Sequence, residues 1–458
     1  MKTKHSRKTF RIRQDEMQSR LRQEIIEGAR KPGSYLPSEK DLADQFGLSN
    51  KIVRDVLAEL AAEGLIEKKP RIGSIVADRS GTGRIVLKLG HHGSTLQETA
   101  LRSLIAAFEA RYPHIAVQDL TLPGHAPEAL TPYLAHGLID AMTLNDAELR
   151  AIAESGEAAQ LQPLEADADS YPFLTEAFVS GGQLLARPFT FSPTILCYNP
   201  EHFREAGLWE PDSGWGWDDL LAAADRLTIP ERRAGFYFSA THRNRLAVYL
   251  LQRGAKAERD AAGRLRMRGT PMMAGIRHYK ELVAGRMTPL LSEQDAGFRV
   301  EELFAQGKLS MMLTTYYGLN ALAQTGIAYD IAPIPTLADP ATLVIGIGLA
   351  VNRHSPRMTE ARLLADFLTG PHAQAIIRRD TLSLPALRAA SEEEGAAASK
   401  PSRFNMYREI IPTFRFGSEL GLREREWSWF LQEVMLYLSG LASEDAFCDS
   451  VEAKGRLS

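Results

Sequence analysis

Asn50, Lys51 and Arg54 are the residues whose types and spacing first point to chemistry, because they share one face near the start of a predicted helix. Long polar side chains in this position can donate hydrogen bonds to base edges and phosphate oxygens in a major groove. The buried stripe expected on the opposite face consists of Val53, Val56, Leu57 and Leu60. The pattern therefore predicts a DNA-recognition helix.

A second helix must precede this one and position it. Ser38 can cap the free N–H groups at its start, and Asp41, three residues on, can cap back toward Ser38. Gly47 supplies the turn between the helices because it adopts positive φ at low cost. Ser49 is expected to cap the recognition helix. The apolar face of the preceding helix consists of Leu42, Ala43 and Phe46.

A small hairpin is predicted after the recognition helix. Residues 65–68 and 74–77 alternate in hydrophobicity, and residues 69–73 between them form a basic tip. Two helices followed by such a hairpin form a winged helix-turn-helix, which we expect in residues 1–77. The candidate DNA-contacting residues are Ser38, Lys40, Ser49, Asn50, Lys51, Arg54, Arg71 and Gly73.

Residues 10–78 resemble the DNA-binding domain of GntR-type regulators. The matching residues are Leu36-Pro37-Ser38-Glu39, Ser49 with Val53-Arg54, and Gly73-Ser74 with Val76. The sequence departs from the family at Lys40, Asn50, Ile52 and Arg71. Ile52 cannot donate the phosphate hydrogen bond that threonine makes in the family, whereas Arg71 is able to reach a narrow minor groove. The family's operator sequence is therefore not carried over.

Charge separates the start of the chain from the rest. Residues 1–83 carry 17 Lys and Arg against 12 Asp and Glu, a net charge of +5, and the remainder carries 37 against 45, a net charge of −8. This asymmetry is typical of a segment that faces nucleic acid beside an acidic body. Residues 1–13 hold six basic residues and no acid, which fits either a phosphate-contacting arm or a merely soluble tail.

Composition limits the remaining classes of protein. There is no apolar N-terminal run and no stretch long enough to span a membrane. Cys197 and Cys448 are too few for a disulfide framework, and neither falls in a metal-ligand spacing. We expect a cytoplasmic protein without membrane contact, metal or cofactor.

Residues 84–458 alternate between predicted strands and helices, after a small, polar, glycine-containing linker at residues 78–83. Residues 84–89 and 115–117 read as strands, and a long amphipathic helix ends between them at Tyr112. The alternation predicts an α/β fold with mostly parallel sheets. Because about 375 residues exceed what one core usually holds, we expect two lobes.

The order of motifs in this segment resembles the solute-binding proteins of ABC importers, a family that mostly carries sugars. The matching stretches are Phe108–Ile115, Tyr198–Leu208, Trp217–Leu220, Phe304–Met312, Ile331–Pro335 and Phe367–Gly370. The resemblance implies a two-lobed, periplasmic-binding-protein-like (type II) domain that closes on a ligand between its lobes. It also implies that a DNA-binding head stands where the family has a secretion signal.

Candidate ligand residues lie in loops at the ends of predicted strands, where a cleft would open. They are His92, Asn145, Asp146, Thr190, Ser192, Trp215, Tyr316 and Tyr317. Asp146 could instead cap the helix that follows it, and Trp217 is better placed in a core. For Tyr316 and Tyr317, contact with a sugar ring and burial in a core remain equal alternatives.

Two enzymatic alternatives were weighed against a sensor. Some GntR-headed regulators carry an aminotransferase-like domain that holds pyridoxal phosphate on a lysine, and Ser399-Lys400 is the nearest match to that signature. Its Ala/Glu/Ser-rich surroundings lack the expected glycines. A glycoside-processing enzyme would need paired carboxylates in a cleft, and no pair can be singled out. We therefore expect no catalysis.

These observations together predict a homodimeric transcription regulator, by family resemblance a repressor. It would bind a pseudo-palindromic double-stranded operator, and a small-molecule effector, expected to be a carbohydrate, would control its affinity.

Overall fold

The computed structural model describes most of the chain. It covers residues 13–14, 17–18, 20–21, 24–25, 29–31, 33–62, 65–69, 73–77, 84–122, 127–240, 242–284, 300–393 and 400–455. The predicted linker at residues 78–83, the residue Arg71 and nearly all of the basic segment at residues 1–13 lie outside the described residues.

Backbone contacts divide the chain into two compact units. The smaller consists of Met1–Leu87 with Ile105–Gln118, and the larger of Lys88–Leu104 with Asp119–Ser458. The part of the smaller unit between residues 33 and 77 is called the head. The elements of the head are α2 (Glu39–Phe46), α3 (Asn50–Ala62), β1 (Ile66–Lys69) and β2 (Gly73–Val76).

The head confirms the local predictions made from caps and turns. The Ser38 hydroxyl accepts a hydrogen bond from the Asp41 amide, and the Asp41 carboxylate accepts one from the Ser38 amide. Gly47 ends α2 with a φ of 62°, a left-handed conformation that glycine adopts without strain. Strands β1 and β2 pair antiparallel, with Ile66 opposite Val76, within one residue of the predicted bounds.

We predict that Ser38→Ala destabilises α2 by about 1 kcal/mol, because the hydroxyl that accepts from the Asp41 amide and donates to the Asp41 carboxylate is lost. Hydrogen exchange of the α2 amides should accelerate correspondingly, while exchange in the larger unit stays the same. Unchanged protection of the α2 amides would show that the cap contributes nothing to this helix.

The larger unit continues the chain through many short elements. From residue 84 to residue 205 they are β3 (Ile85–His91), α4 (Thr95–Glu98), α5 (Leu101–Arg111), β4 (Ile115–Thr121), α6 (Pro127–Ala135), β5 (Ala141–Asn145), α7 (Asp146–Glu154), η1 (Glu157–Gln160), α8 (Pro172–Ala177), β6 (Val179–Ser180), β7 (Gln183–Leu184), β8 (Arg187–Tyr198) and α9 (Pro200–Glu205). The boundary between the two units passes through β3, α5 and β4.

The second half of the chain supplies the remaining elements. They are α10 (Trp217–Leu227), β9 (Ala234–Tyr237), α11 (Arg243–Gln252), β10 (Glu258–Arg259), β11 (Leu265–Arg266), α12 (Pro271–Val283), α14 (Val300–Ala305), β12 (Leu309–Thr315), α15 (Tyr316–Leu322), β13 (Asp330–Ala332), β14 (Thr342–Val351), α16 (Met358–Thr369), α17 (Pro371–Asp380), β15 (Leu384–Pro385), α18 (Arg388–Glu392), η2 (Phe404–Met406), α19 (Tyr407–Ile410), η3 (Ile411–Thr413), β16 (Phe414–Arg415), η4 (Gly417–Leu420), α20 (Glu424–Leu438) and α21 (Glu444–Lys454).

The main sheet is mixed, so the expectation of mostly parallel strands was wrong for its centre. Its order is β4-β3-β5-β14-β8-β12-β9, with β13 and β15 also paired to β8 and β16 to β14. β3 and β5 are parallel, as are β12 and β9. β8 and β14 are antiparallel, with Val344 opposite Pro193 and Leu349 opposite Arg187. The reason is that the chain leaves one lobe along β8 and returns along β14.

Two of the hydrophobic clusters in the larger unit mark two lobes, and another packs around β8 and β12. The first-lobe core includes Leu130, Leu144, Leu149 and Ile152, which come from α6, β5 and α7. The second-lobe core is built mainly from α10, α11, α12, α20 and α21. The alternation of elements and the length of the segment had predicted this division.

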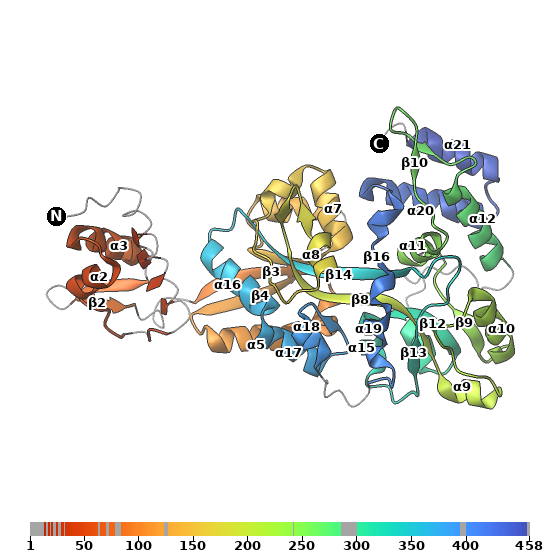
Figure 1. The fold of residues 1–458 in the computed structure, drawn as a ribbon, viewed down its shortest axis with the longest axis horizontal. Coiled ribbons are helices and arrows are strands. Elements are labelled where there is room, and N and C mark those ends of the chain that lie inside the picture. The colour runs from red at the N-terminus through yellow and green to blue at the C-terminus, as the bar shows by residue number, and fades with distance from the viewer. Residues whose placement is uncertain are drawn as a thin grey trace. The chain divides into compact units, whose positions relative to one another are not determined.

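β8 and β14 run side by side through the middle of the larger unit and connect the lobes (Figure 1). In β14, Ala350 belongs to the first-lobe core and Leu343 to the second-lobe core. The register between the two strands shifts at Ile347/Gly348. A Cβ on Gly348 would lie 2.9 Å from the Ala186 Cβ, so only glycine fits where the strands change register. β8 and β14 occupy the place of the hinge strands that the resemblance to solute-binding proteins implies.

Within the described residues, none of the helices combines the length and apolar character needed to cross a bilayer.

Candidate functional site

The outer face of α3 carries the predicted DNA-contacting side chains. Asn50, Lys51 and Arg54 are all exposed. Val53, Val56, Leu57 and Leu60 lie at 0 to 1% exposure on the opposite face. The helix therefore presents its polar residues outward as a recognition helix must.

Arg54 is held in place by the helix that precedes α3. Its Nε lies 2.6 Å from the Glu39 carboxylate, and its backbone oxygen accepts a hydrogen bond from the Lys68 ammonium at 3.4 Å. Both side chains of the ion pair are substantially exposed, at 63% and 39%, so the pair contributes little to stability. It leaves the guanidinium free to exchange its partner for a phosphate or a base.

The other predicted DNA-contacting residues differ in exposure and in local role. Lys40 is exposed on α2, and Gly73 is exposed at the start of β2 with a φ of 124°. Ser38 and Ser49 are exposed but act as helix caps, since the Ser49 hydroxyl accepts from the Ile52 amide at 3.4 Å. Arg71 lies outside the described residues, so its proposed contact stays a prediction.

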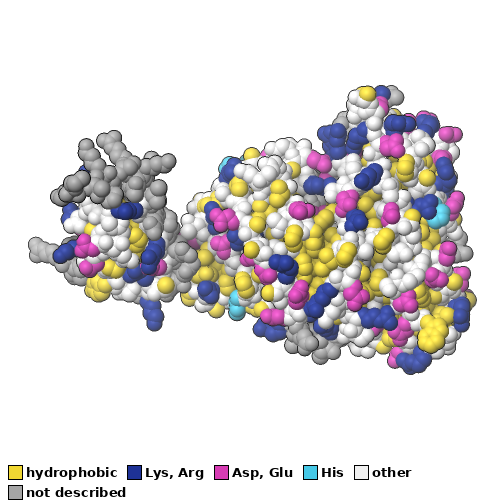
Figure 2. All heavy atoms as spheres, in the orientation of Figure 1, with side chains coloured by type: hydrophobic (Ala, Val, Ile, Leu, Met, Phe, Trp, Pro, Cys, Tyr) yellow, Lys and Arg dark blue, Asp and Glu magenta, His cyan; other side chains and the backbone are white. Residues whose placement is uncertain are grey.

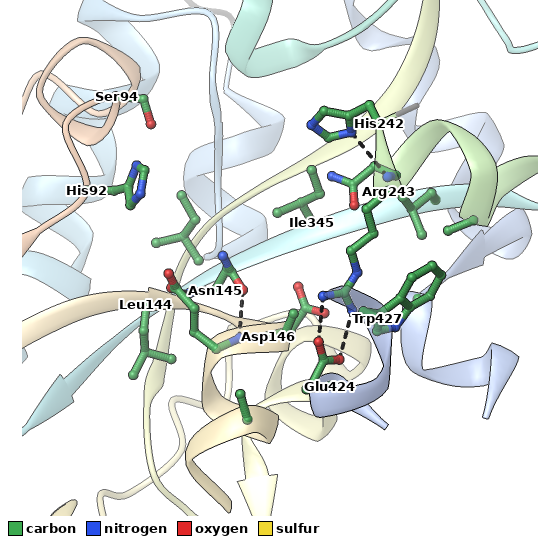
Figure 3. Close-up of a pocket in the computed structure, with 18 of the residues that line it drawn as sticks. His92, Ser94, Leu144, Asn145, Asp146, His242, Arg243, Ile345, Glu424 and Trp427 are labelled. Atoms are coloured by element: carbon green, nitrogen blue, oxygen red, sulfur yellow. Dashed lines mark hydrogen bonds and ion pairs between the residues drawn. The ribbon is translucent and has the colours of Figure 1, made fainter. Parts of the chain in front are cut away.

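A cleft in the larger unit brings together four of the predicted ligand residues: His92, Asn145, Asp146 and Tyr317. Its volume is about 1110 Å³. Residues of β5 and α7 line it from the first lobe, and residues of α11 and α20 line it from the second. In Figure 3, His92 and Ser94 lie on one side of the cleft and His242 and Arg243 on the other.

The other four predicted ligand residues do not line this cleft. Thr190 and Ser192 are fully buried in β8, where Thr190 bonds the Tyr317 hydroxyl and Ser192 accepts from the Tyr317 amide. Tyr316 is also fully buried and donates to the Phe404 carbonyl. Trp215 packs against the second-lobe core.

The physical reason for this burial is position in the sheet. β8 is buried along nearly its whole length, because helices such as α8, α15 and α16 pack against the sheet there and leave its side chains no free face. Trp217, which was expected in a core, is 4% exposed and donates its indole N–H to Gln252.

Asn145 and Asp146 occupy the point where β5 becomes α7. Asn145 is the N-cap of α7, accepting from the Glu148 amide at 2.8 Å. The alternative that Asp146 caps the helix is therefore wrong: its carboxylate instead accepts from the Gly346 amide of β14 at 3.1 Å.

Asp146 lines the cleft, and part of its surface still faces the cavity. Burial raises the pKa of its carboxyl to about 6, although the Gly346 hydrogen bond and the nearby Arg150 and Arg243 oppose the shift. The Gly346 amide donates one hydrogen bond to this carboxylate, and a carboxylate can accept several. Hydroxyl groups of a ligand would supply the others.

The second lobe contributes cleft residues that the sequence analysis missed. Arg243 of α11 donates to the Glu424 carboxylate of α20 at 2.5 and 2.9 Å, and its guanidinium lies 4.5 Å from the centroid of the Trp427 ring. Figure 3 shows this group beside Asp146. His242, Asn244 and Ser428 also line it.

Sequence alone carried little signal for these residues. Glu424 and Trp427 belong to an amphipathic helix whose aromatic side chains are typical of a core. Only the fold turns the first turn of α20 toward the cleft, and none of the quoted motifs reaches beyond residue 370.

The floor of the cleft is apolar. Leu343, Val344 and Ile345 of β14 line it, and Figure 2 shows hydrophobic atoms gathered over this part of the larger unit. An apolar floor surrounded by amide, carboxylate, imidazole and hydroxyl groups suits a ligand with both apolar faces and many hydroxyls.

Two family models match the chain. Residues 13–76 match bacterial regulatory proteins of the gntR family. Residues 93–375 match the bacterial extracellular solute-binding proteins. The second match covers much of the segment to which the pyridoxal-phosphate alternative would apply, and it ends before Lys400. The lysine of that alternative, Lys400, lies 4.7 Å from the ring centroid of Phe404.

Curated relatives are similar to part of the chain. The uncharacterized HTH-type transcriptional regulator YieP of Escherichia coli (strain K12) is 41% identical over 61 residues, 13% of this chain and 26% of that protein. The HTH-type transcriptional regulator Mce2R of Mycobacterium tuberculosis is 30% identical over 136 residues, 29% of this chain and 54% of that protein. The chain thus spans about a quarter to a half of these relatives.

Solved structures are similar to the larger part of the chain. The ABC substrate-binding protein Lmo0181 from Listeria monocytogenes, in complex with cycloalternan, has a TM-score of 0.69 at 19% identity, covering 82% of this chain and 98% of that one. The sugar-binding protein MalE from Xanthomonas citri has a TM-score of 0.64 at 18% identity, covering 81% and 96%. At these identities the likeness establishes the fold.

Proposed function

Because the chain belongs to the family of bacterial extracellular solute-binding proteins and carries a gntR-type regulatory head, we propose that it is a DNA-binding transcription regulator controlled by a sugar or oligosaccharide. The single observation that carries this proposal is the presence, in one chain, of an exposed recognition helix and a cleft lined by two lobes. Ligand binding would change operator affinity to the extent that it discriminates between two states of the protein.

The cleft supports a carbohydrate as the effector. Its volume of about 1110 Å³ exceeds the roughly 300–1,000 Å³ of pockets for drug-sized ligands, so an oligosaccharide has room. Asn145 and Asp146 offer polar groups at one side and the β14 residues an apolar surface beneath. The structural neighbours are described as bound to cycloalternan or as sugar-binding, which agrees with this chemistry.

The head supports binding to double-stranded DNA in the cytoplasm, where operators are found. Heads of this kind usually read two half-sites, so we propose a homodimer on a pseudo-palindrome. Repression relieved by ligand is the proposed direction of control. No enzymatic activity is part of the proposal.

A thermal-shift screen of the purified protein against mono- and oligosaccharides tests the sensor. We expect saturable stabilisation by one sugar, since a ligand at about 100 times its Kd raises stability by about 2.7 kcal/mol. Amino acids and polyamines serve as controls. If no sugar stabilises the protein, the carbohydrate proposal is wrong.

The regulatory step needs a second measurement. An operator can be recovered by selecting random DNA fragments on the protein, and its affinity then measured with and without the stabilising sugar. A change in affinity is expected, with binding that weakens steeply as salt increases. Equal affinity with and without a bound sugar would contradict control by this ligand.

A further inference from the structure

Glu424, the first residue of α20, is bound by side chains from two different elements. Its carboxylate pairs with Arg150 of α7 and with Arg243 of α11. Only 5% of the Glu424 side chain is exposed, against 28% for Arg150 and 26% for Arg243. A carboxylate buried to this extent is stable only with such charge-assisted partners.

A second bond joins the same two helices. The Glu424 backbone N–H at the start of α20 donates to the Glu154 carboxylate of α7 at 2.8 Å. Glu154 therefore satisfies one of the amide groups that a helix start leaves without an internal partner, and its negative charge suits that end of the helix.

These contacts connect the two lobes directly. α7 packs through Leu149 and Ile152 into the first-lobe core, and α20 packs through Phe430 and Val434 into the second-lobe core. Glu154 and Glu424 both line the cleft, so the bonds lie at its edge. In addition to the covalent connections, which include β8 and β14, α7 and α20 thus hold the lobes together by non-covalent contacts.

We propose that Arg150 and Glu154 of α7, together with Glu424 of α20, form a latch that holds the lobes closed in the absence of ligand. Arg243 belongs to the same lobe as Glu424 and binds it from within that lobe. When the latch opens, Glu424 keeps Arg243 as its partner, and Arg150, already partly exposed, is solvated. Opening therefore leaves no buried charge unpaired, which makes the latch reversible.

The latch has a consequence for the proposed sensor, and this consequence rests on the proposed function. A ligand that binds the closed lobes has an apparent Kd equal to its intrinsic Kd divided by the closed fraction. Because the latch sets that fraction, weakening it raises the apparent Kd although none of the latch bonds involves the ligand. The latch itself requires neither a sugar nor DNA.

Distances between the lobes of the ligand-free, full-length protein test the latch. Spin labels at Ala135→Cys on α6 and Ala446→Cys on α21 lie on exposed positions of the first and second lobes. The native Cys197 and Cys448 are free but buried, so the introduced positions label selectively. An excess of unlabelled protein removes distances between copies.

The latch predicts one short, narrow distance distribution in the parent protein. In Arg150→Met, the fraction of molecules with a longer distance between the labels should be about tenfold larger than in the parent protein. This is the change expected for the loss of one charge-assisted pair. Glu154→Gln should also increase the fraction with the longer distance, but by less. If Arg150→Met does not fold, Glu154→Gln tests the latch in its place. The matched control is Arg277→Met, which removes an ion pair with Glu444 between α12 and α21, inside the second lobe.

Each outcome decides the proposal. A distribution that is the same in the Arg150→Met, Glu154→Gln and parent proteins overturns it, as does a parent protein that is already mainly open without ligand. Loss of sugar binding in Arg150→Met without a change in distance also overturns the latch, but leaves the proposed sugar sensor standing. A lengthened distance with no sugar found supports the latch and counts only against the carbohydrate ligand.

Discussion

Replacing Arg54 by alanine is expected to weaken operator binding about tenfold to a hundredfold, the loss of about 1–3 kcal/mol associated with one specific arginine contact. Arg54 is exposed on the outer face of α3, and its Glu39 partner can be exchanged for DNA. Titration of the selected operator at several salt concentrations measures the effect. The salt slope should also fall by about one if Arg54 contacts a phosphate.

The fold and the ligand cleft should be unaffected by Arg54→Ala. The Arg54–Glu39 pair is exposed, and such pairs contribute about 0–1 kcal/mol. Arg362→Ala, an exposed arginine on α16 of the larger unit, is the control for a change of net charge. If Arg54→Ala binds the operator as tightly as this control, α3 is not the recognition helix in the orientation assigned here.

Asp146→Asn is expected to stabilise the protein at neutral pH and to weaken sugar binding. The pKa of Asp146 is raised from 3.8 to about 6 by burial. At one pKa unit per 1.36 kcal/mol, its ionised form costs up to about 3 kcal/mol of folding stability. Asparagine removes the charge and keeps an oxygen that accepts the Gly346 amide.

The pH dependence of this effect follows from the direction of the shift. Below about pH 4 the carboxyl is protonated in both the folded and unfolded states, so the two proteins should be equally stable. The stability of the parent protein relative to Asp146→Asn falls as the pH rises from about 4 to about 6, and the difference stays constant above that range. Urea unfolding at about pH 4.5 and pH 7.5 measures it.

Binding provides the second readout for Asp146→Asn. One oxygen acceptor becomes an amide donor, so a sugar that uses both oxygens should bind at least about tenfold more weakly. A gain in stability with a loss of binding is the usual compromise at a functional site. Asp225→Asn, exposed on α10, is the control and should change neither property. Equal stability of the parent and Asp146→Asn proteins at about pH 7.5 would show that the ionised Asp146 carboxylate does not destabilise the folded protein.

The elements of the head could be predicted from the sequence because their signals are local. The Ser38 cap, the Gly47 turn and the apolar stripe of α3 each depend on residues within a few positions of one another. Their bounds in the structure differ from prediction by one residue or less for the strands. The order of motifs likewise predicted a two-lobed fold in the larger segment.

The direction of the central strands could not be predicted in this way. Alternation of strands and helices favours parallel pairing, but β14 contributes to the cores of both lobes and runs antiparallel to β8. Which lobe a strand enters depends on contacts between residues far apart in the sequence. The local hydrophobic pattern therefore cannot predict it.

The sequence by itself determined the DNA-binding face and the type of sensor fold, since both follow from short-range spacing and from motifs in order. Only the tertiary structure decided which residues line the cleft. Asn145 and Asp146 reach it because β5 ends there, whereas Thr190 and Ser192 are buried because helices pack against β8. Glu424 enters the cleft from a helix more than 250 residues away from Arg150. The physical reason is that burial and charge pairing depend on which segments the fold brings together, not on the residues adjacent in the chain.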